Sequence, residues 1–194
     1  MDRARAEAAA AGGAVMLAER VHKLNPAEVE DPALKEVLEK SERLSTPKPA
    51  WFLTLGHNPE MAVAYFDYWD LTHRGGKVDH RIKELMRIAV SALLGCEFCA
   101  AQRSNVALDQ GLNEDDAQAC ALPDFNHPDP RTRAALRFAR ALTLDSPSDP
   151  VDWDPIYEEL QAVFDEDEIV ELGCFAAIAV GGVKLSRSLN EPDR

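Results

Sequence analysis

The chain has 194 residues, 46% of them hydrophobic, so it is long enough for one domain with a sizeable core. Its formal net charge of −13 argues against nucleic-acid binding, because such a surface has to neutralise phosphates. The sequence has no uninterrupted apolar stretch of about 20 residues, so we expect no membrane span.

The first 20 residues, MDRARAEAAAAGGAVMLAER, predict an N-terminal helix and not a secretory signal peptide. Asp2 and Glu7 place acidic charge where a signal peptide is basic, and Gly12 splits the apolar run. We therefore expect a cytoplasmic protein. Four cysteines are too few for a disulfide scaffold in a chain of this length, and in the cytoplasm catalytic or metal-binding roles are the more common ones.

Helical spacing of apolar residues dominates the chain, and β-branched residues are sparse. A proline-bracketed break between Ser45 and Pro49 divides an N-terminal helical arm, residues 1–45, from a main domain, residues 46–194. The pattern predicts an all-α fold, without the βαβ units of nucleotide-binding or thioredoxin folds. The expected helices cover residues 27–43, 59–74, 80–95, 97–110, 114–120, 131–144, 156–164 and 165–189.

The segment LLGCEFCAAQRSN places Cys96 and Cys99 three residues apart, directly after the apolar helix 80–95. Because Gly95 precedes it, Cys96 is expected just before the next helix, with Cys99 in the first turn of that helix. Unpaired N–H groups at that position favour a thiolate, and the two sulfurs are within reach of a disulfide. Both points favour a redox pair, although plain packing, or a metal site with two further ligands, stays open. No second Cys-x-x-Cys and no His-x-x-x-His supplies such ligands, so we expect no metal and no cofactor.

Two charged residues accompany the pair. Arg103 follows Cys99 by four residues, the spacing at which helical side chains meet, so its charge is expected to stabilise a Cys99 thiolate. Glu84 is the only carboxylate between Asp79 and Glu97. Beside an apolar helix its pKa is expected to be raised, so that it exchanges a proton near neutral pH.

Ordinary structural roles stay open for both residues. Glu84 fits a surface carboxylate paired with Lys83, Arg87 or Arg81, and Arg103 fits a plain helix-surface residue. Cys120 and Cys174 are expected to be small core residues. A set of aromatic residues is expected mainly in the core or at a subunit interface, with the lining of a substrate pocket as the alternative. These are Trp51, Phe52, Tyr65, Phe66, Tyr68 and Trp69.

The order Glu84, Cys96, Cys99 and then ALDQGLNEDDAQA resembles the carboxymuconolactone decarboxylase / alkylhydroperoxidase D family. The segments LGHNPEMAVAYF and GGKVDHRIKELMRIAV are similar to the lead-in helices of that family. RAALRFARALT and FDEDEIVELGCFAAIAV are similar to the C-terminal helices of its longer, peroxidase-related members. The resemblance covers residues 49–189 and leaves out the arm.

This resemblance implies an alkylhydroperoxidase D-like helical bundle that forms homo-oligomers, often trimers or hexamers. It also implies reduction of an organic hydroperoxide, or thiol–disulfide exchange. Cys99 would attack the O–O bond and become a sulfenic acid, Cys96 would resolve it as a disulfide, and Glu84 would relay the proton. A dithiol reductant, a lipoyl-bearing adaptor in some members, would then reduce the pair.

One position departs from the family pattern. The family places a histidine four residues after the second cysteine, where this chain has Arg103, so the proton relay would need Glu84 and water, or His57 or His80 brought close by the fold. Two other functions therefore stay open. One is decarboxylation of a lactone acid, although the members with that activity usually lack the cysteine pair. The other is a redox-sensing or binding module of the same fold with weakened turnover.

Overall fold

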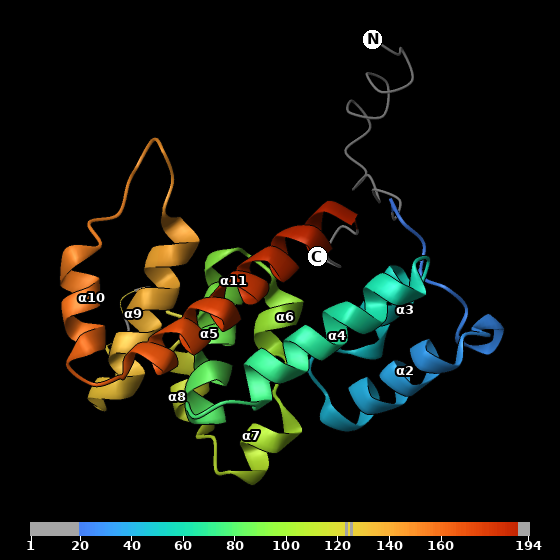
Figure 1. Ribbon diagram of the computed structural model, residues 1–194, viewed down its shortest axis with the longest axis horizontal. Coiled ribbons are helices and arrows are strands. Elements are labelled where there is room, and N and C mark those ends of the chain that lie inside the picture. Colours follow the sequence, from blue (N-terminus) through green and yellow to red (C-terminus); the bar gives the residue numbers. More distant parts are fainter. Residues whose placement is uncertain (1–19, 123, 125, 190–194) are drawn as a thin grey trace, which may run out of the picture.

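The computed structural model describes residues 20–122, 124 and 126–189, and within them the chain forms helices and no strand (Figure 1). The all-α prediction is therefore confirmed, whereas the helix predicted near the N-terminus lies outside the described residues. A short 3₁₀ helix, η1, covers Pro26–Glu28. The α-helices are α2 (Pro32–Leu44), α3 (Pro49–Leu55), α4 (Pro59–Arg74), α5 (His80–Leu93), α6 (Glu97–Ala101), α7 (Asn105–Asp109), α8 (Glu114–Ala119), α9 (Pro130–Leu144), α10 (Asp154–Gln161) and α11 (Glu166–Leu189).

Polar caps and prolines set where most of these helices begin. At six N-caps a side-chain oxygen accepts a backbone N–H of the first turn, which satisfies one of the unpaired donors there. Proline at the first helical position adds to this in three of them, because its fixed φ suits a helix start. The six caps are Asp31, Asn58, Asp79, Ser104, Asn113 and Asp129.

Two of the predicted helices are each broken in the structure. The prediction of one helix over 27–43 is wrong, because Asp31 caps a new helix at Pro32 and leaves only η1 before it. The prediction of one helix over 97–110 is wrong as well, because α6 ends at Ala101 and α7 begins at Asn105. Helix α3 lies in a segment for which no helix was predicted, immediately after the break at Ser45.

Helix α5 is the centre of the main core and packs against α9, α6 and α11 (Figure 1). Eleven of its 14 residues are buried, so nearly the whole helix is enclosed by its neighbours. Several of the buried side chains are polar or charged, and these residues form the site described below. They are His80, Lys83, Glu84, Arg87 and Ser91.

A second, smaller core joins the end of the arm to the main domain. Leu34 and Val37 of α2 pack with Phe52 of α3 and Phe66 of α4, at the opposite end of the molecule from α9 and α10 (Figure 1). Helix α4 belongs to both cores, since Trp69 packs into the main one. The division at residue 45 stays a prediction.

Helix α11 is long and apolar enough to cross a membrane, by length and composition only. Its buried side chains Leu172, Phe175 and Ala176 belong to the main core. On its polar edge, Glu171 accepts hydrogen bonds from the backbone N–H of Lys77 (2.7 Å) and from Lys83 Nζ (2.8 Å). We therefore read α11 as a core helix that is fixed to α5 and to the loop before it.

Candidate active site

The cysteine pair is a disulfide at the junction of α5 and α6. Gly95, with φ of 69°, lies in the left-handed region that glycine adopts without strain, and it turns the chain between the two helices. Cys96 is the N-cap of α6, and its Sγ accepts the backbone N–H of Cys99 (3.3 Å). The two Cα atoms are 5.3 Å apart. The predicted placement of both cysteines at a helix start is confirmed, and redox activity of the pair stays a prediction.

The two sulfurs differ in exposure. Cys96 is 3% exposed, whereas Cys99 is half-buried on the first turn of α6. An attacking thiolate has to reach its substrate, and a resolving thiol only has to reach the first sulfur. The burial pattern therefore favours Cys99 as the attacking residue.

Glu84 lies on α5 with no solvent exposure, so it is not a surface carboxylate. Arg87, one turn along the same helix, donates from Nε to Oε2 (2.9 Å) and from Nη2 to Oε1 (2.8 Å). The backbone N–H of Ser104 donates to Oε1 (2.7 Å), and His73 Nε2 lies 3.0 Å from Oε2. Both carboxylate oxygens are therefore fully engaged.

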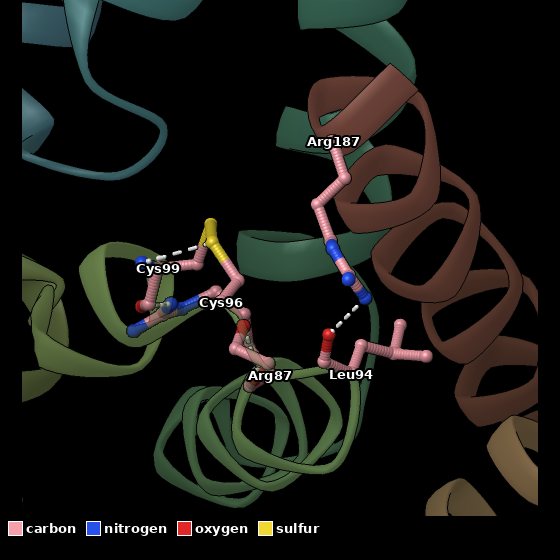
Figure 2. Close-up of a disulfide and its surroundings, with 6 residues drawn as sticks. Arg87, Leu94, Cys96, Cys99 and Arg187 are labelled. Atoms are coloured by element: carbon pink, nitrogen blue, oxygen red, sulfur yellow. Dashed lines mark hydrogen bonds between the residues drawn. A yellow bond between two sulfur atoms is a disulfide. The ribbon is translucent and has the colours of Figure 1, made fainter. Parts of the chain in front are cut away.

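Arg87 connects this buried carboxylate to the cysteine helix. Its guanidinium also donates to the backbone carbonyls of Cys99 and Gln102, at the end of α6. Figure 2 shows Arg87 beside the two cysteines. These bonds account for the break in the predicted helix 97–110. The Gln102 carbonyl is held by Arg87 and the Ser104 N–H by Glu84, so neither group is free for a continuous helix.

The expectation of a raised pKa at Glu84 is wrong. Burial by itself raises the pKa of this carboxyl, but the charge and the two hydrogen bonds of Arg87, with a further contribution from His73, hold it well below its usual value. Glu84 is therefore a carboxylate at neutral pH. In the sequence, Arg87 was one of three basic residues that could pair with Glu84 at the surface. Helical spacing does not reveal that both Glu84 and Arg87 are buried.

Two histidines lie beside Glu84, and the sequence singled out only one of them. Burial lowers the pKa of His73 to about 3, so the ring is neutral at pH 7. It stacks on Phe175, with ring centroids 4.8 Å apart. His80 Nε2 is 2.8 Å from Ser104 Oγ, the residue whose N–H binds Glu84, and burial lowers the pKa of His80 as well. His57 lies elsewhere, bound to the His22 carbonyl.

Arg103 lies past the end of α6, because the predicted continuous helix is broken after Ala101. Its side chain therefore makes other contacts than the one expected with Cys99. It pairs with Glu114 through two hydrogen bonds (2.9 and 2.8 Å) and also donates to the carbonyls of Ala100 and Gln102. Arg103 is not among the residues that line the cavity at the cysteines. Its positive charge is thus shared mainly with a carboxylate, and its bonds fix the α6–α7 loop.

A cavity of about 170 Å³ lies against the disulfide. Cys96 and Cys99 line it together with α11 and the segment that leads into α3, and Figure 2 shows the disulfide and Arg187 of α11 near this space. Three of the aromatic residues noted in the sequence form its apolar walls, and the others do not line it. The three are Trp51, Tyr65 and Trp69.

The remaining cysteines are free and lie outside this cavity. Cys120 is 1% exposed, and burial raises the pKa of its thiol to about 12, as suits the core residue that was expected. Cys174 is only half-buried, so its expected place inside the core is wrong. Among the described residues, no group of three or more His, Cys, Asp and Glu side chains is arranged to hold a metal ion.

Residues 59–141, which include α4, α5 and both cysteines, match the model of the Carboxymuconolactone decarboxylase family. Over that segment the chain resembles the family, as the sequence predicted. No curated protein matches the chain by sequence. Helix α11 lies outside the matched segment and supplies part of the cavity wall.

Solved structures share the fold over nearly the whole chain. A variant of the debrominase Bmp8 in complex with 2,3,4-tribromopyrrole has a TM-score of 0.74 at 21% identity, covering 92% of this chain and 93% of that one. An alkylhydroperoxidase AhpD core protein, an uncharacterized peroxidase-related protein from Ralstonia eutropha JMP134, has a TM-score of 0.65 at 22% identity, with coverages of 90% and 92%. An uncharacterized peroxidase-related protein from Silicibacter sp. TM1040 has a TM-score of 0.69 at 14% identity, with coverages of 94% and 96%. The alkylhydroperoxidase D-like fold is thereby confirmed.

Proposed function

We propose that this protein is a thiol-dependent reductase that reduces an organic hydroperoxide through Cys99 and Cys96. The observation that carries the proposal is the position of the disulfide in the wall of an aromatic-lined cavity. A structural disulfide needs no such cavity, whereas a catalytic one needs room for a substrate beside the sulfur that reacts.

The reaction starts from the reduced pair. The Cys99 thiolate attacks the outer oxygen of the hydroperoxide, the O–O bond breaks, and the alkoxide takes up a proton and leaves as the alcohol. Cys99 is now a sulfenic acid. The Cys96 thiol attacks this sulfur, an S–S bond forms, and water leaves with the thiol proton. The sum is one hydroperoxide and one dithiol converted to one alcohol, one water and one disulfide.

In this proposal Glu84 and Arg87 are positioning residues. Glu84 is ionised and covered by its partners, so it orients Arg87 and the Ser104 N–H instead of donating a proton at neutral pH. Arg87 in turn holds the Cys99 carbonyl and so fixes the turn that carries both sulfurs. Arg103 supports the same turn from the other side through the Ala100 and Gln102 carbonyls.

A dithiol has to return the pair to its reduced form, and we propose a small or protein-bound dithiol such as a lipoyl group for this step. Thiol–disulfide exchange through the same cavity requires no further residue. We further propose a cytoplasmic homo-oligomer, in keeping with large apolar side chains that are exposed on two helices in contact with each other. These are Met61, Tyr68 and Leu71 of α4 and Val170 of α11.

Two other activities fit the same cavity. A debrominase shares the fold. Replacing a ring bromine by hydrogen takes two electrons and releases bromide, and in this chain Cys96 and Cys99 would supply both electrons by forming their disulfide. Decarboxylation of a lactone acid needs no thiols. A double variant, Cys96→Ser with Cys99→Ser, that still consumes a carboxylated lactone would support decarboxylation over both reductive reactions.

The test of the proposal is steady-state consumption of cumene hydroperoxide with dihydrolipoamide as reductant. We expect turnover in the wild-type protein and none above the protein-free rate in Cys99→Ser. Cys174→Ala is the matched control, because Cys174 is free and lies outside the cavity, and it should keep the wild-type rate. Turnover in Cys99→Ser equal to that of the control would contradict the assignment.

A further inference from the structure

The cavity at the disulfide has a charge opposite to that of the chain. The chain has a formal net charge of −13, with 34 acidic and 21 basic residues. The cavity lining nevertheless contains four basic side chains and, within the described residues, no Asp or Glu. The four are Lys23, Lys48, Arg87 and Arg187. A cluster of one sign in a cavity attracts ligands of the other sign.

Arg87 is not available to such a ligand, since Glu84 and two carbonyls occupy its donors. Arg187 differs, because its hydrogen bond to the Leu94 carbonyl (Figure 2) uses one of the five N–H donors of a guanidinium. Lys48 Nζ donates to Ser45 Oγ (2.6 Å), and an ammonium has three donors. No acidic side chain pairs with either cation among the described residues, so both keep donors and charge for an anion.

Two of the residues that line the cavity carry a buried polar atom without a hydrogen-bond partner. Trp69 is 5% exposed and Thr46 is fully buried, yet neither Trp69 Nε1 nor Thr46 Oγ1 has a hydrogen-bond partner. Both residues line the cavity. A buried donor without an acceptor destabilises the protein, and a ligand oxygen within reach of it would remove that cost.

The size of the cavity limits what fits beside the cysteines. Its volume is about 170 Å³. An apolar protein cavity of roughly 150 Å³ holds one benzene ring. Trp51, Tyr65 and Trp69 provide flat walls for such a ring, and Tyr65 and Trp69 are stacked with centroids 6.4 Å apart.

We propose that the cavity binds a single-ring organic anion, with the ring against Trp51 and Trp69 and the acidic group bound by Lys48 and Arg187. This inference rests on the proposed function. The preferred substrate is then a hydroperoxide with a carboxylate or a similar anionic group on its ring, opposite the carbon that carries the O–O group. The anion fixes the molecule at the cavity rim, and the hydroperoxide reaches Cys99.

The binding test uses benzoate as the probe and the oxidised protein, in which the cysteines do not react. We expect benzoate to quench the fluorescence of Trp51 and Trp69, whereas benzamide, of the same shape and without charge, should bind about tenfold more weakly or worse. Arg187→Met and Lys48→Met should each weaken benzoate about tenfold and leave benzamide unchanged. Lys184→Met is the matched control, because Lys184 is an exposed cation on α11 that does not line the cavity.

The kinetic test compares cumene hydroperoxide with its 4-carboxylated form, which has the same reacting group. We expect a lower KM for the carboxylated compound, with the difference lost in Arg187→Met and at high salt. Equal KM values for the two hydroperoxides, with equal affinities for benzoate and benzamide, would overturn the anion proposal. If both hydroperoxides were still turned over, the reductase proposal would stand. Selective benzoate binding with no turnover of either compound would keep the anion site and refute the reductase.

Discussion

The buried pair of Glu84 and Arg87 leads to a stability prediction whose size follows from the structure. Glu84 is fully buried and Arg87 is 4% exposed, so neither charge is compensated by water. Glu84→Gln keeps the size and shape of the side chain but removes its charge, which leaves the guanidinium buried without a counter-ion. Removing one partner of a buried pair costs about 3–5 kcal/mol. We expect Glu84→Gln to lower the free energy of unfolding by that amount.

A double-mutant cycle separates the pair from its surroundings. Arg87→Met should cost about as much as Glu84→Gln, because it leaves a buried carboxylate unpaired. The double variant should lose less than the sum of the two single losses, by about 0.5–3 kcal/mol, because it contains no unpaired buried charge. The assay is guanidinium unfolding followed by circular dichroism, with the disulfide intact and the protein concentration held fixed.

The control for this cycle is the pair of Arg103 and Glu114, in which Glu114 is 50% exposed. Glu114→Gln should cost less than about 1 kcal/mol, as exposed ion pairs do. If Glu84→Gln costs no more than Glu114→Gln, the Glu84 carboxylate is not the buried, paired charge described above. The explanation of the broken helix at Gln102 would then fail with it.

Three further predictions follow from the same geometry. Between about pH 6.5 and pH 3 the unfolded chain protonates His73 and the folded chain does not, so the free energy of unfolding should fall as pH falls, by up to about 1.4 kcal/mol per pH unit for this group; His73→Phe should flatten that slope in acid titrations of unfolding. Arg103→Gln should raise the pKa of the reduced Cys99 thiol by less than about half a unit, read from thiolate absorbance in a Cys96→Ser background, because its charge is shared with a carboxylate; a rise of more than about one unit would restore a direct role for Arg103. Iodoacetamide should label Cys174 in the native protein and leave Cys120 unmodified until unfolding, and faster labelling of Cys120 would contradict the burial described for it.

Most of the fold was predictable because its signals are local. Asn58 with Pro59, Asp79, and Asn113 are short-range caps, and the structure begins helices at each of them. The helix over 97–110 failed because the groups that break it are distant in sequence. Glu84 and Arg87 bind backbone atoms of residues 99–104 only once α5 and α6 are packed together, and no periodicity encodes that contact.

The candidate site was predictable to a similar degree. The Cys-x-x-Cys spacing placed both cysteines correctly, and the aromatic set contained three of the cavity walls. The direction of the Glu84 pKa shift could not be predicted from the sequence. Burial raises this pKa and the charge of Arg87 lowers it, and only the structure shows that Arg87 is close enough to outweigh burial. The basic character of the cavity could not be predicted either, since Lys48 and Arg187 are far apart in the chain and only the fold places both in the cavity lining.

The central claim is that Cys96 and Cys99 form a working redox pair. The most direct measurement is the intact mass of fully reduced protein before and after one equivalent of cumene hydroperoxide, for the wild type and for Cys99→Ser. The account predicts that the wild type rapidly loses the mass of two hydrogen atoms and that the variant does not. A wild-type protein that stays reduced, while a small thiol in the same solution is oxidised, would contradict it.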